Sequence, residues 1–377
     1  SKNSWLKPER KDGNGNLSVR IQYDKNDTNK RSGVITLTCE GVTPKEISVT
    51  QTELTFKNPI AGIPDPWIIK HNDYYYICKA QGDGINISKS SKLSAITPTK
   101  NVWKAPVDQG TNKPWNVTHV WAPELHRIDG RWYIYYAAGR PRDELGYYQQ
   151  RSGVLRAKTD DPMGEWEDMG MLYTGDNYQE GIKPTTANTF YAIDLGVFKL
   201  NKQLYAVWSG YPDGSSEQLL YIAKMSNPYT ISSNRFIISY PDKSWELVVS
   251  GTKINEGPAF LKNKEKNKFF VVYSCNGSWT KNYRLGYVML NDTLKDPTVR
   301  ANWTKSTTSV FTRCDDSANF EGVNGVGHCS FTKSPDDTED WIIYHVKNRN
   351  DNTYTSGRST FVQSFKWNSD GTPDFGT

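Results

Sequence analysis

One pattern recurs five times along this chain and restricts the folds that it can adopt. Each copy has an ionisable residue, a short apolar run, a polar turn and an aromatic-rich run. Two such runs around a turn are typical of a β-hairpin. The spacing of roughly 60–70 residues is too long for one hairpin and fits a four-stranded unit with long loops. The copies begin at Asp65, Glu124, Asp194, Glu256 and His328.

Five units of this kind predict an all-β fold, with a five-bladed β-propeller over residues 53–377. The aromatic fraction of 13% and the 19 prolines agree with β structure. A radial arrangement leaves only short, protected sheet edges, whereas a linear solenoid, the alternative, fits the unequal spacings less well. Equivalent positions of a propeller converge on its axis. We therefore expect the five ionisable residues to ring the mouth of the central channel.

Residues 1–52 are predicted to form a separate small β module. Two segments, LSVRIQYD and GVITLTCEG, alternate apolar and polar residues around a polar turn, as antiparallel strands do. The module resembles part of a BACON-type immunoglobulin-like domain, and that resemblance implies an accessory module of a secreted or surface-attached bacterial protein. It is carried by Trp5, Asn26, Arg31 to Gly33 and Val49 to Gln51.

Charge and cysteine content exclude several functions. The 46 basic and 41 acidic residues leave a net charge of +5, and no basic block indicates nucleic-acid binding. Five cysteines without a CxxC pair indicate neither a disulfide framework nor a zinc site. No stretch approaches the roughly 18 apolar residues of a membrane span. Because no signal peptide begins the chain, either the protein is cytosolic or the sequence starts after processing.

Grouped carboxylates at one channel mouth suggest acid–base chemistry. Such groups repel one another and lose solvation, so their clustering indicates a functional site. Glycoside hydrolysis needs this grouping. One carboxyl group must stay protonated to assist the leaving oxygen, a second must be ionised to activate water, and a third can hold the two pKa values apart.

From about residue 58 to 377 the chain resembles the family 43 glycoside hydrolases, five-bladed propeller enzymes that act on arabinans, arabinoxylans and xylosides. Six motifs carry the resemblance in order. They are IPDPWI, HVWAPELH, AIDLGVF, NEGPAF, GVGHCSF and GRSTFVQSFKWNSDGTPDFG.

The resemblance implies a role for one residue in most of these motifs. Asp65 would be the general base, Glu256 the general acid, and Asp194 the carboxylate that orients the acid and tunes its pKa. His328 would lie on the axis, facing substrate or close to a bound calcium ion. Arg358 would bind the sugar. No organic cofactor is expected.

Three further residues have less specific interpretations. Trp67 and Trp121 adjoin the axial acids and could stack on a sugar face, but packing in the core explains them equally well. Glu124 is left out of the catalytic set, because orienting a neighbouring group is at least as good an explanation.

These observations predict an inverting glycosidase that releases terminal α-L-arabinofuranosyl units from plant cell-wall arabinan or arabinoxylan. The protein is expected to be secreted, periplasmic or attached to the cell surface. An endo-arabinanase and a β-xylosidase are the alternatives within the family. A non-catalytic, glycan-binding propeller is the alternative from another class. Cys329, which follows His328 where the family commonly has Asn, makes the sugar-contacting set differ from the family pattern.

Overall fold

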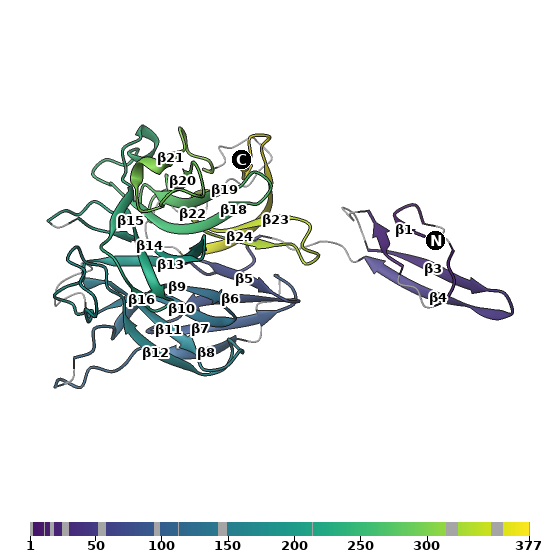
Figure 1. The fold of residues 1–377 in the computed structure, drawn as a ribbon, viewed down its shortest axis with the longest axis horizontal. Coiled ribbons are helices and arrows are strands. Elements are labelled where there is room, and N and C mark those ends of the chain that lie inside the picture. Colours follow the sequence, from purple (N-terminus) through teal and green to yellow (C-terminus); the bar gives the residue numbers. More distant parts are fainter. Residues whose placement is uncertain are drawn as a thin grey trace. The chain divides into compact units, whose positions relative to one another are not determined.

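The computed structural model divides into two compact units, Ser1–Lys57 and Asn58–Thr377 (Figure 1). It describes residues 3–10, 12–15, 19–24, 30–51, 58–93, 99–111, 113–141, 149–212, 214–313, 323–347 and 357–376. Asn26, part of the BACON-like pattern, lies outside the described residues. None of the helices in the described ranges is long and apolar enough to cross a membrane.

The N-terminal unit is the small β module that the sequence predicts. Its two antiparallel sheets pair β1 with β2 and β3 with β4. Trp5, Leu6 and Ile35 are buried together, and the Arg31 guanidinium lies 4.4 Å from the centre of the Trp5 ring. The strands are β1 (Leu6–Pro8), β2 (Ile21–Tyr23), β3 (Arg31–Cys39) and β4 (Val42–Gln51).

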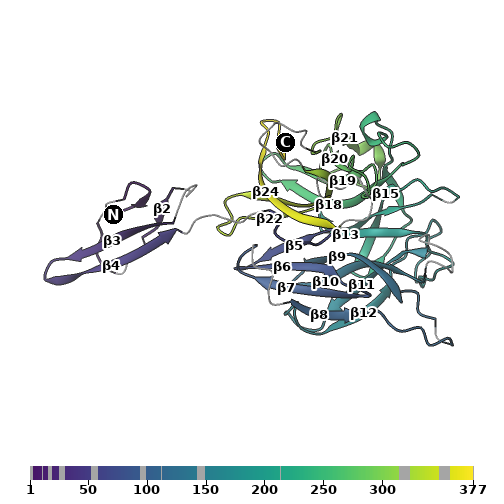
Figure 2. The ribbon, with the colours of Figure 1, turned by 180° about the vertical axis from the view of Figure 1, so that it is seen from behind.

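The second unit has five antiparallel sheets within the described residues, and they are the blades of the predicted five-bladed propeller (Figures 1 and 2). Blade 1 has β5 (Trp67–His71), β6 (Tyr74–Ala80), β7 (Gly84–Ser90) and β8 (Thr99–Lys104). Blade 2 has β9 (Thr118–Ile128), β10 (Arg131–Gly139), β11 (Arg151–Ala157) and β12 (Trp166–Met171). Blade 3 has β13 (Ala192–Leu200), β14 (Gln203–Gly210), β15 (Leu219–Asn227), β16 (Thr230–Ile231) and β17 (Phe236–Ser239).

The last two blades follow the same order. Blade 4 has β18 (Asn255–Asn263), β19 (Lys268–Cys275), β20 (Arg284–Leu290) and β21 (Trp303–Lys305), and the short 3-10 helices η2 (Ser244–Glu246) and η3 (Arg300–Asn302) precede β18 and β21. Blade 5 has β22 (Asn324–Lys333), β23 (Asp340–Lys347), β24 (Arg358–Trp367) and β25 (Pro373–Asp374).

The first strand of each blade lines the axis. β5 contacts β9, β9 contacts β13, β13 contacts β18, β18 contacts β22, and β22 contacts β5 again, so the ring is closed. Apolar side chains fill the space between neighbouring blades, mostly from the aromatic-rich second strands. Trp132 and Trp208 belong to these apolar clusters, and Trp341 is buried as well. This burial is the main force that holds the blades together.

The ring closes where blade 5 meets blade 1. The segment before blade 1 pairs with β24, through hydrogen bonds from Ile60 N to Thr360 O and from Thr360 N to Ala61 O. The Ser330 hydroxyl donates to Pro66 O at 3.0 Å and accepts from Ile68 N at 3.2 Å. Since these two residues flank Trp67, the contact fixes the start of β5.

We expect Ser330→Ala to destabilise the propeller. Ser330 is 1% exposed, and its removal leaves two buried backbone groups without partners. The expected cost is about 2 kcal/mol of unfolding free energy, measured by urea denaturation. The exposed Ser91→Ala is the matched control and should leave the unfolding midpoint unchanged. Equal midpoints for the two variants would contradict this account of the closure.

Candidate active site

A residue with a positive φ angle lies just before or within the inner strand of every blade. The backbone φ angles are 48° at Asp65, 41° at Ala122, 55° at Asp194, 58° at Gly257 and 46° at His328. L side chains rarely adopt this conformation, and it persists only where the surrounding structure imposes it. Blades 2 to 5 also shift their strand register at this point.

This backbone repeat corrects one expectation from the sequence. Asp65, Asp194 and His328 occupy the equivalent positive-φ position, as predicted. Glu256 instead precedes that position by one residue, and Glu124 follows it by two. The five ionisable residues therefore do not share one phase.

Asp65 is an ionised carboxylate at the closure of the ring. Its Oδ1 lies 2.6 Å from an Arg358 guanidinium nitrogen and 3.2 Å from Nδ1 of both His328 and His345. Burial alone would raise the pKa of Asp65, but the Arg358 charge and the two imidazoles hold it well below its usual range. Asp65 therefore carries a negative charge throughout the physiological pH range.

His345 was not among the residues predicted from the sequence. It is fully buried, and its Nδ1 also lies 3.2 Å from the backbone N of Asp65. That nitrogen accepts from the amide or donates to the carboxylate, according to the tautomer. Burial lowers the pKa of His345 to about 4 and also lowers that of His328, so both rings are neutral near pH 7.

A recurring polar position could have identified His345. Ser209, Ser274 and His345 occupy matching places near the ends of second strands, opposite Ile193, Glu256 and Gly327. Ser209 donates to Asn255 O, and Ser274 accepts from His328 N, at the start of the following blade. One polar residue inside each apolar run is the signal.

Asp194 and Glu256 form a pair of acids with raised pKa values. Asp194 is 5% exposed and Glu256 is 7% exposed. Burial raises the pKa of Asp194, and the charges of Glu256 and Asp65 raise it further. Burial also raises the pKa of Glu256 to about 7, with a contribution from Asp65 that Tyr283, Arg358 and Gln218 partly offset. Two neighbouring acids of this kind lose their protons in coupled steps.

Backbone and side-chain contacts place this pair. Asp194 Oδ2 accepts a hydrogen bond from Gly257 N at 3.0 Å, and Glu256 Oε2 accepts one from Gln218 Nε2 at 3.3 Å. The contact to Gly257 ties Asp194 of blade 3 to the residue that follows Glu256 in blade 4.

Tyr283 is another site residue that the sequence analysis missed. Its ring stacks on His345 at a centroid distance of 5.4 Å and an angle of 6°. A Cβ on Gly327 would lie 2.3 Å from this ring, so only glycine leaves room for it. The Tyr283 hydroxyl is buried and close enough to Glu256 to lower the pKa of that acid. Nothing in the surrounding loop sequence signals this position.

Glu124 lies below the mouth and pairs with His126. Its Oε2 is 2.8 Å from His126 Nε2, and the side chain is 2% exposed. A Cβ on Gly196 would come within 2.5 Å of the same oxygen, so Glu124 fills the channel beside β13. Burial raises the pKa of Glu124 and lowers that of His126 to about 3, which makes a neutral hydrogen-bonded pair. These contacts agree with its exclusion from the catalytic set.

The two predicted tryptophans differ in their surroundings. Trp67 Nε1 donates to Leu125 O at 2.7 Å, and its ring packs 4.7 Å from that of His126. Trp121 packs at the edge of a small apolar cluster that contains Tyr191 and Ile193. A sugar-stacking role for either tryptophan stays a prediction.

A pocket of about 490 Å³ lies at blade 3, and Asp65, Asp194 and Glu256 are not among the residues that line it. Tyr191 and Tyr211 stack in its wall with ring centres 4.1 Å apart. Burial raises the pKa of Tyr191, and the charges of Glu256 and Asp194 contribute, so this wall adjoins the acids. The pocket is lined by Arg151, Phe190, Tyr191, Tyr211, Pro212, Gly214, Ser215 and Ser216.

The described side chains at the mouth do not form a direct calcium site. In the described part of the chain, no three His, Cys, Asp or Glu side chains gather to hold a metal ion. The Arg358 guanidinium already occupies Asp65 Oδ1, and its charge repels a cation. Calcium prefers six to eight oxygen ligands, which His328 does not supply.

The raised pKa of Glu256 predicts a pH-dependent cost to stability. Because the pKa rises from 4.5 to about 7 on folding, the folded protein holds a proton that the unfolded chain releases, and stability falls as pH rises through this range. We expect Glu256→Gln to stabilise the protein by about 2–3 kcal/mol more at pH 8 than at pH 5. Urea denaturation at both pH values measures this, with the exposed Glu180→Gln as control. An equal effect at both pH values would contradict the raised pKa.

Comparisons with known proteins agree with this geometry. Residues 56–373 match the family "Glycosyl hydrolases family 43", and residues 1–52 match BACON, described as "Putative binding domain, N-terminal". A crystal structure of α-L-arabinofuranosidase from Lactobacillus brevis matches with a TM-score of 0.72 and 32% identity, over 85% of this chain and 95% of that one.

Two Streptomyces proteins share the name "Extracellular exo-alpha-(1->5)-L-arabinofuranosidase". The one from Streptomyces avermitilis is 34% identical over 336 residues, 86% of this chain and 63% of that protein. The one from Streptomyces chartreusis is 30% identical over 302 residues, 78% of this chain and 82% of that protein. The match thus spans less than two thirds of the Streptomyces avermitilis protein. From the family match and the propeller fold together, this chain belongs to glycosyl hydrolase family 43.

Proposed function

We propose that this protein is an inverting glycoside hydrolase that releases terminal α-L-arabinofuranosyl units from arabinan or arabinoxylan. One observation carries the proposal: an ionised carboxylate, Asp65, shares the site with two acids whose pKa values are raised. Divergent pKa values separate the base from the acid in such enzymes.

In this mechanism Asp65 accepts a proton from water as the water oxygen attacks the anomeric carbon. The glycosidic C–O bond breaks on the opposite face, and Glu256 gives its proton to the departing oxygen. With a pKa of about 7, Glu256 is protonated in a large fraction of the molecules at neutral pH. The charge of Asp65 helps to keep this proton on Glu256, and Asp194 holds the Gly257 backbone beside the acid. Solvent returns the proton to Glu256 and removes the one on Asp65.

Arg358 and His328 both contact Asp65, and we propose that they also bind the sugar. Arg358 keeps Asp65 ionised, and its remaining guanidinium donors are suited to a sugar hydroxyl. His328 is neutral, so one ring nitrogen donates and the other accepts.

The pocket beside Tyr191 is proposed to receive the leaving part of the substrate. The acid protonates the glycosidic oxygen, so the departing sugar lies on the side of Glu256. Gln218 contacts Glu256. Ser216, two residues before Gln218 in the sequence, lines the pocket. The aromatic pair Tyr191 and Tyr211 offers apolar contact area for a sugar ring.

The names of the relatives support arabinose as the sugar. The two Streptomyces proteins are named exo-arabinofuranosidases, whereas an arabinan endo-1,5-α-L-arabinosidase from Aspergillus flavus matches only 170 residues at 27% identity. Both Streptomyces proteins are also named extracellular, which supports action outside the cytoplasm on a polysaccharide. A secreted, periplasmic or cell-surface location is part of this proposal.

We expect the protein to hydrolyse 4-nitrophenyl α-L-arabinofuranoside much faster than 4-nitrophenyl β-D-xyloside, and to release only arabinose from linear arabinan. Glu256→Gln and Asp65→Asn should each lower kcat/KM by about 10²–10⁴, as loss of a general acid or base does. Proton NMR during the first minutes should show β-arabinofuranose as the initial product, because a single displacement inverts the anomeric carbon.

Glu180→Gln, on the exposed surface, is the control for these variants. Release of longer oligosaccharides from arabinan would identify an endo-acting enzyme, and preferred turnover of the xyloside would change the sugar. Binding to arabinan without any hydrolysis would contradict the enzyme and favour a glycan-binding propeller.

A calcium ion near His328 remains part of the proposal, held through water because the side chains that the structure describes form no direct site. Binding to the folded state alone would raise the melting temperature by mass action. We expect protein treated with EDTA to melt at a higher temperature after CaCl2 is added, while MgCl2 at the same ionic strength has no effect. Identical melting temperatures would contradict a calcium site.

A further inference from the structure

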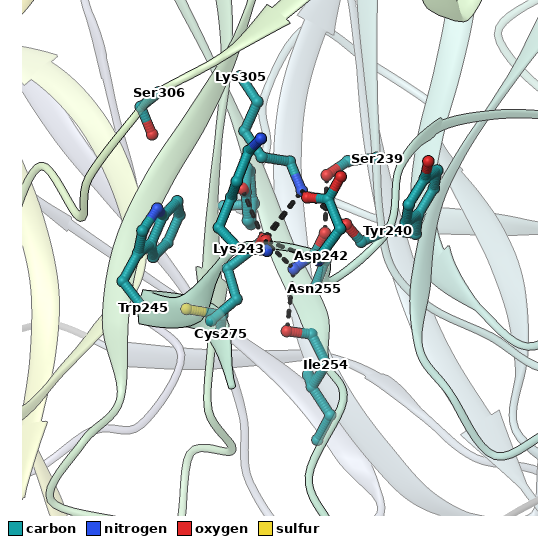
Figure 3. A network of polar contacts seen from close by, with 12 residues as sticks. Ser239, Tyr240, Asp242, Lys243, Trp245, Ile254, Asn255, Cys275, Lys305 and Ser306 are labelled. Atoms are coloured by element: carbon teal, nitrogen blue, oxygen red, sulfur yellow. Dashed lines mark hydrogen bonds and ion pairs between the residues drawn. The ribbon is translucent and has the colours of Figure 1, made fainter. Parts of the chain in front are cut away.

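A second cluster of buried polar side chains lies where blade 3 meets blade 4 (Figure 3). At its centre is an ion pair between Glu246 of η2 and Lys305 of β21, the outer strand of blade 4, with Nζ 3.0 Å from Oε2. The Glu246 side chain is fully buried and that of Lys305 is 11% exposed. No part of the mechanism above uses this pair.

Every acceptor position of the Glu246 carboxylate is filled. Lys305 Nζ lies within 3.1 Å of both oxygens. The other donors to Oε1 are Asn255 Nδ2 and Tyr273 Oη, each at 2.8 Å, and those to Oε2 are the backbone N of Asp242 at 3.0 Å and of Lys243 at 2.9 Å.

Hydrogen bonds hold both the side chain and the backbone of Asn255. Its Nδ2 donates to Glu246, and its Oδ1 accepts from the Ser239 hydroxyl at 2.7 Å. Its backbone N donates to Gln218 O at 2.9 Å, and its backbone O accepts from the Ser209 hydroxyl at 2.8 Å. Asn255 is fully buried, so water does not replace any of these contacts.

Asn255 immediately precedes Glu256, the proposed acid. The regular pairing of β18 with β19 ends at Glu256 and resumes only at Ala259. Regular strand pairing therefore does not include Gly257 and Pro258, directly after Glu256. Two side-chain contacts flank it instead: Glu246 holds the residue before, and Asp194 holds the Gly257 backbone after.

A buried ion pair adds little net stability to a folded protein. Removing two charges from water costs about as much as their attraction returns, and apolar residues often serve as well. A fully satisfied polar network does, however, hold one geometry more strictly than apolar packing. Glu246 and Lys305 therefore fit a role in fixing geometry.

We propose that the Glu246–Lys305 ion pair positions Glu256 for proton transfer by fixing Asn255. Both are positioning residues, because they reach the acid only through Asn255. The inference rests on the proposed role of Glu256 as the acid. A displacement of about 1 Å at a reacting group is enough to slow a reaction severely.

Glu246→Gln tests the proposal through the leaving group of the substrate. Hydrogen-bond donors surround both carboxylate oxygens, so the NH2 group of glutamine must face donors on one side. Methyl α-L-arabinofuranoside needs protonation of its leaving oxygen, whereas the 2,4-dinitrophenyl arabinoside does not. We expect kcat to fall by about tenfold or more on the methyl glycoside and to change less than about twofold on the dinitrophenyl glycoside, with KM unchanged on both.

Lys305→Met is the second variant, and Lys70→Met is its matched control. Lys70 is similarly buried, at 9% side-chain exposure, and likewise binds backbone carbonyl groups and an aspartate, Asp337. Lys70 lies on β5 of blade 1, and it takes no part in the hydrogen bonds described above for Asn255. Lys305→Met should show the selective loss on the methyl glycoside, and Lys70→Met should not.

The outcomes separate this inference from the proposed function. Equal losses on both glycosides, or none, would overturn the positioning role while Glu256→Gln still showed the selective loss. A Glu256→Gln variant without dependence on the leaving group would overturn the acid assignment itself, and the inference with it. Should Glu246→Gln fail to fold, Lys305→Met decides by the same criterion.

Discussion

The ion pair between Asp65 and Arg358 depends on closure of the ring, and the site depends on that ion pair. Asp65 begins blade 1, whereas Arg358, His328 and His345 all belong to blade 5. These residues are far apart in the sequence and meet only when the last blade packs against the first. The propeller must therefore be complete before the pKa of Asp65 is lowered, and an unclosed chain would hold this carboxylate without its counter-charge.

The acids are placed by a different part of the ring. Asp194 comes from blade 3 and Glu256 from blade 4, and neither has a cation within hydrogen-bonding distance among the described residues. Burial raises the pKa of both acids, and the charge of Asp65 raises both further, whereas the pKa of Asp65 itself is lowered. The three carboxylates acquire opposite pKa shifts because Arg358, at the seam between blades 5 and 1, forms its ion pair with Asp65.

The sequence was sufficient to predict the fold, whereas the roles that it assigns to the carboxylates stay predictions. The repeated hairpins predicted five blades, and the ordered motifs predicted Asp65, Asp194 and Glu256 at the mouth. It did not reveal that Glu256 lies one residue out of phase, because a strand bulge is a backbone property without a clear residue signature. His345 and Tyr283 were missed for a related reason. Their place in the site depends on contacts between blades, and each lies in a segment that reads as ordinary strand or loop.

The positions of Asp65 and Glu256 are fixed by different means. Asp65 is fixed by charge, since Arg358 and two imidazoles converge on one oxygen. Glu256 has to remain protonated, so a nearby cation would defeat its function by lowering its pKa. Its position must come from contacts that leave the carboxyl group itself nearly untouched. An ion pair at Glu246 and Lys305 meets this need, because it fixes the preceding residue while its two charges compensate each other away from the acid.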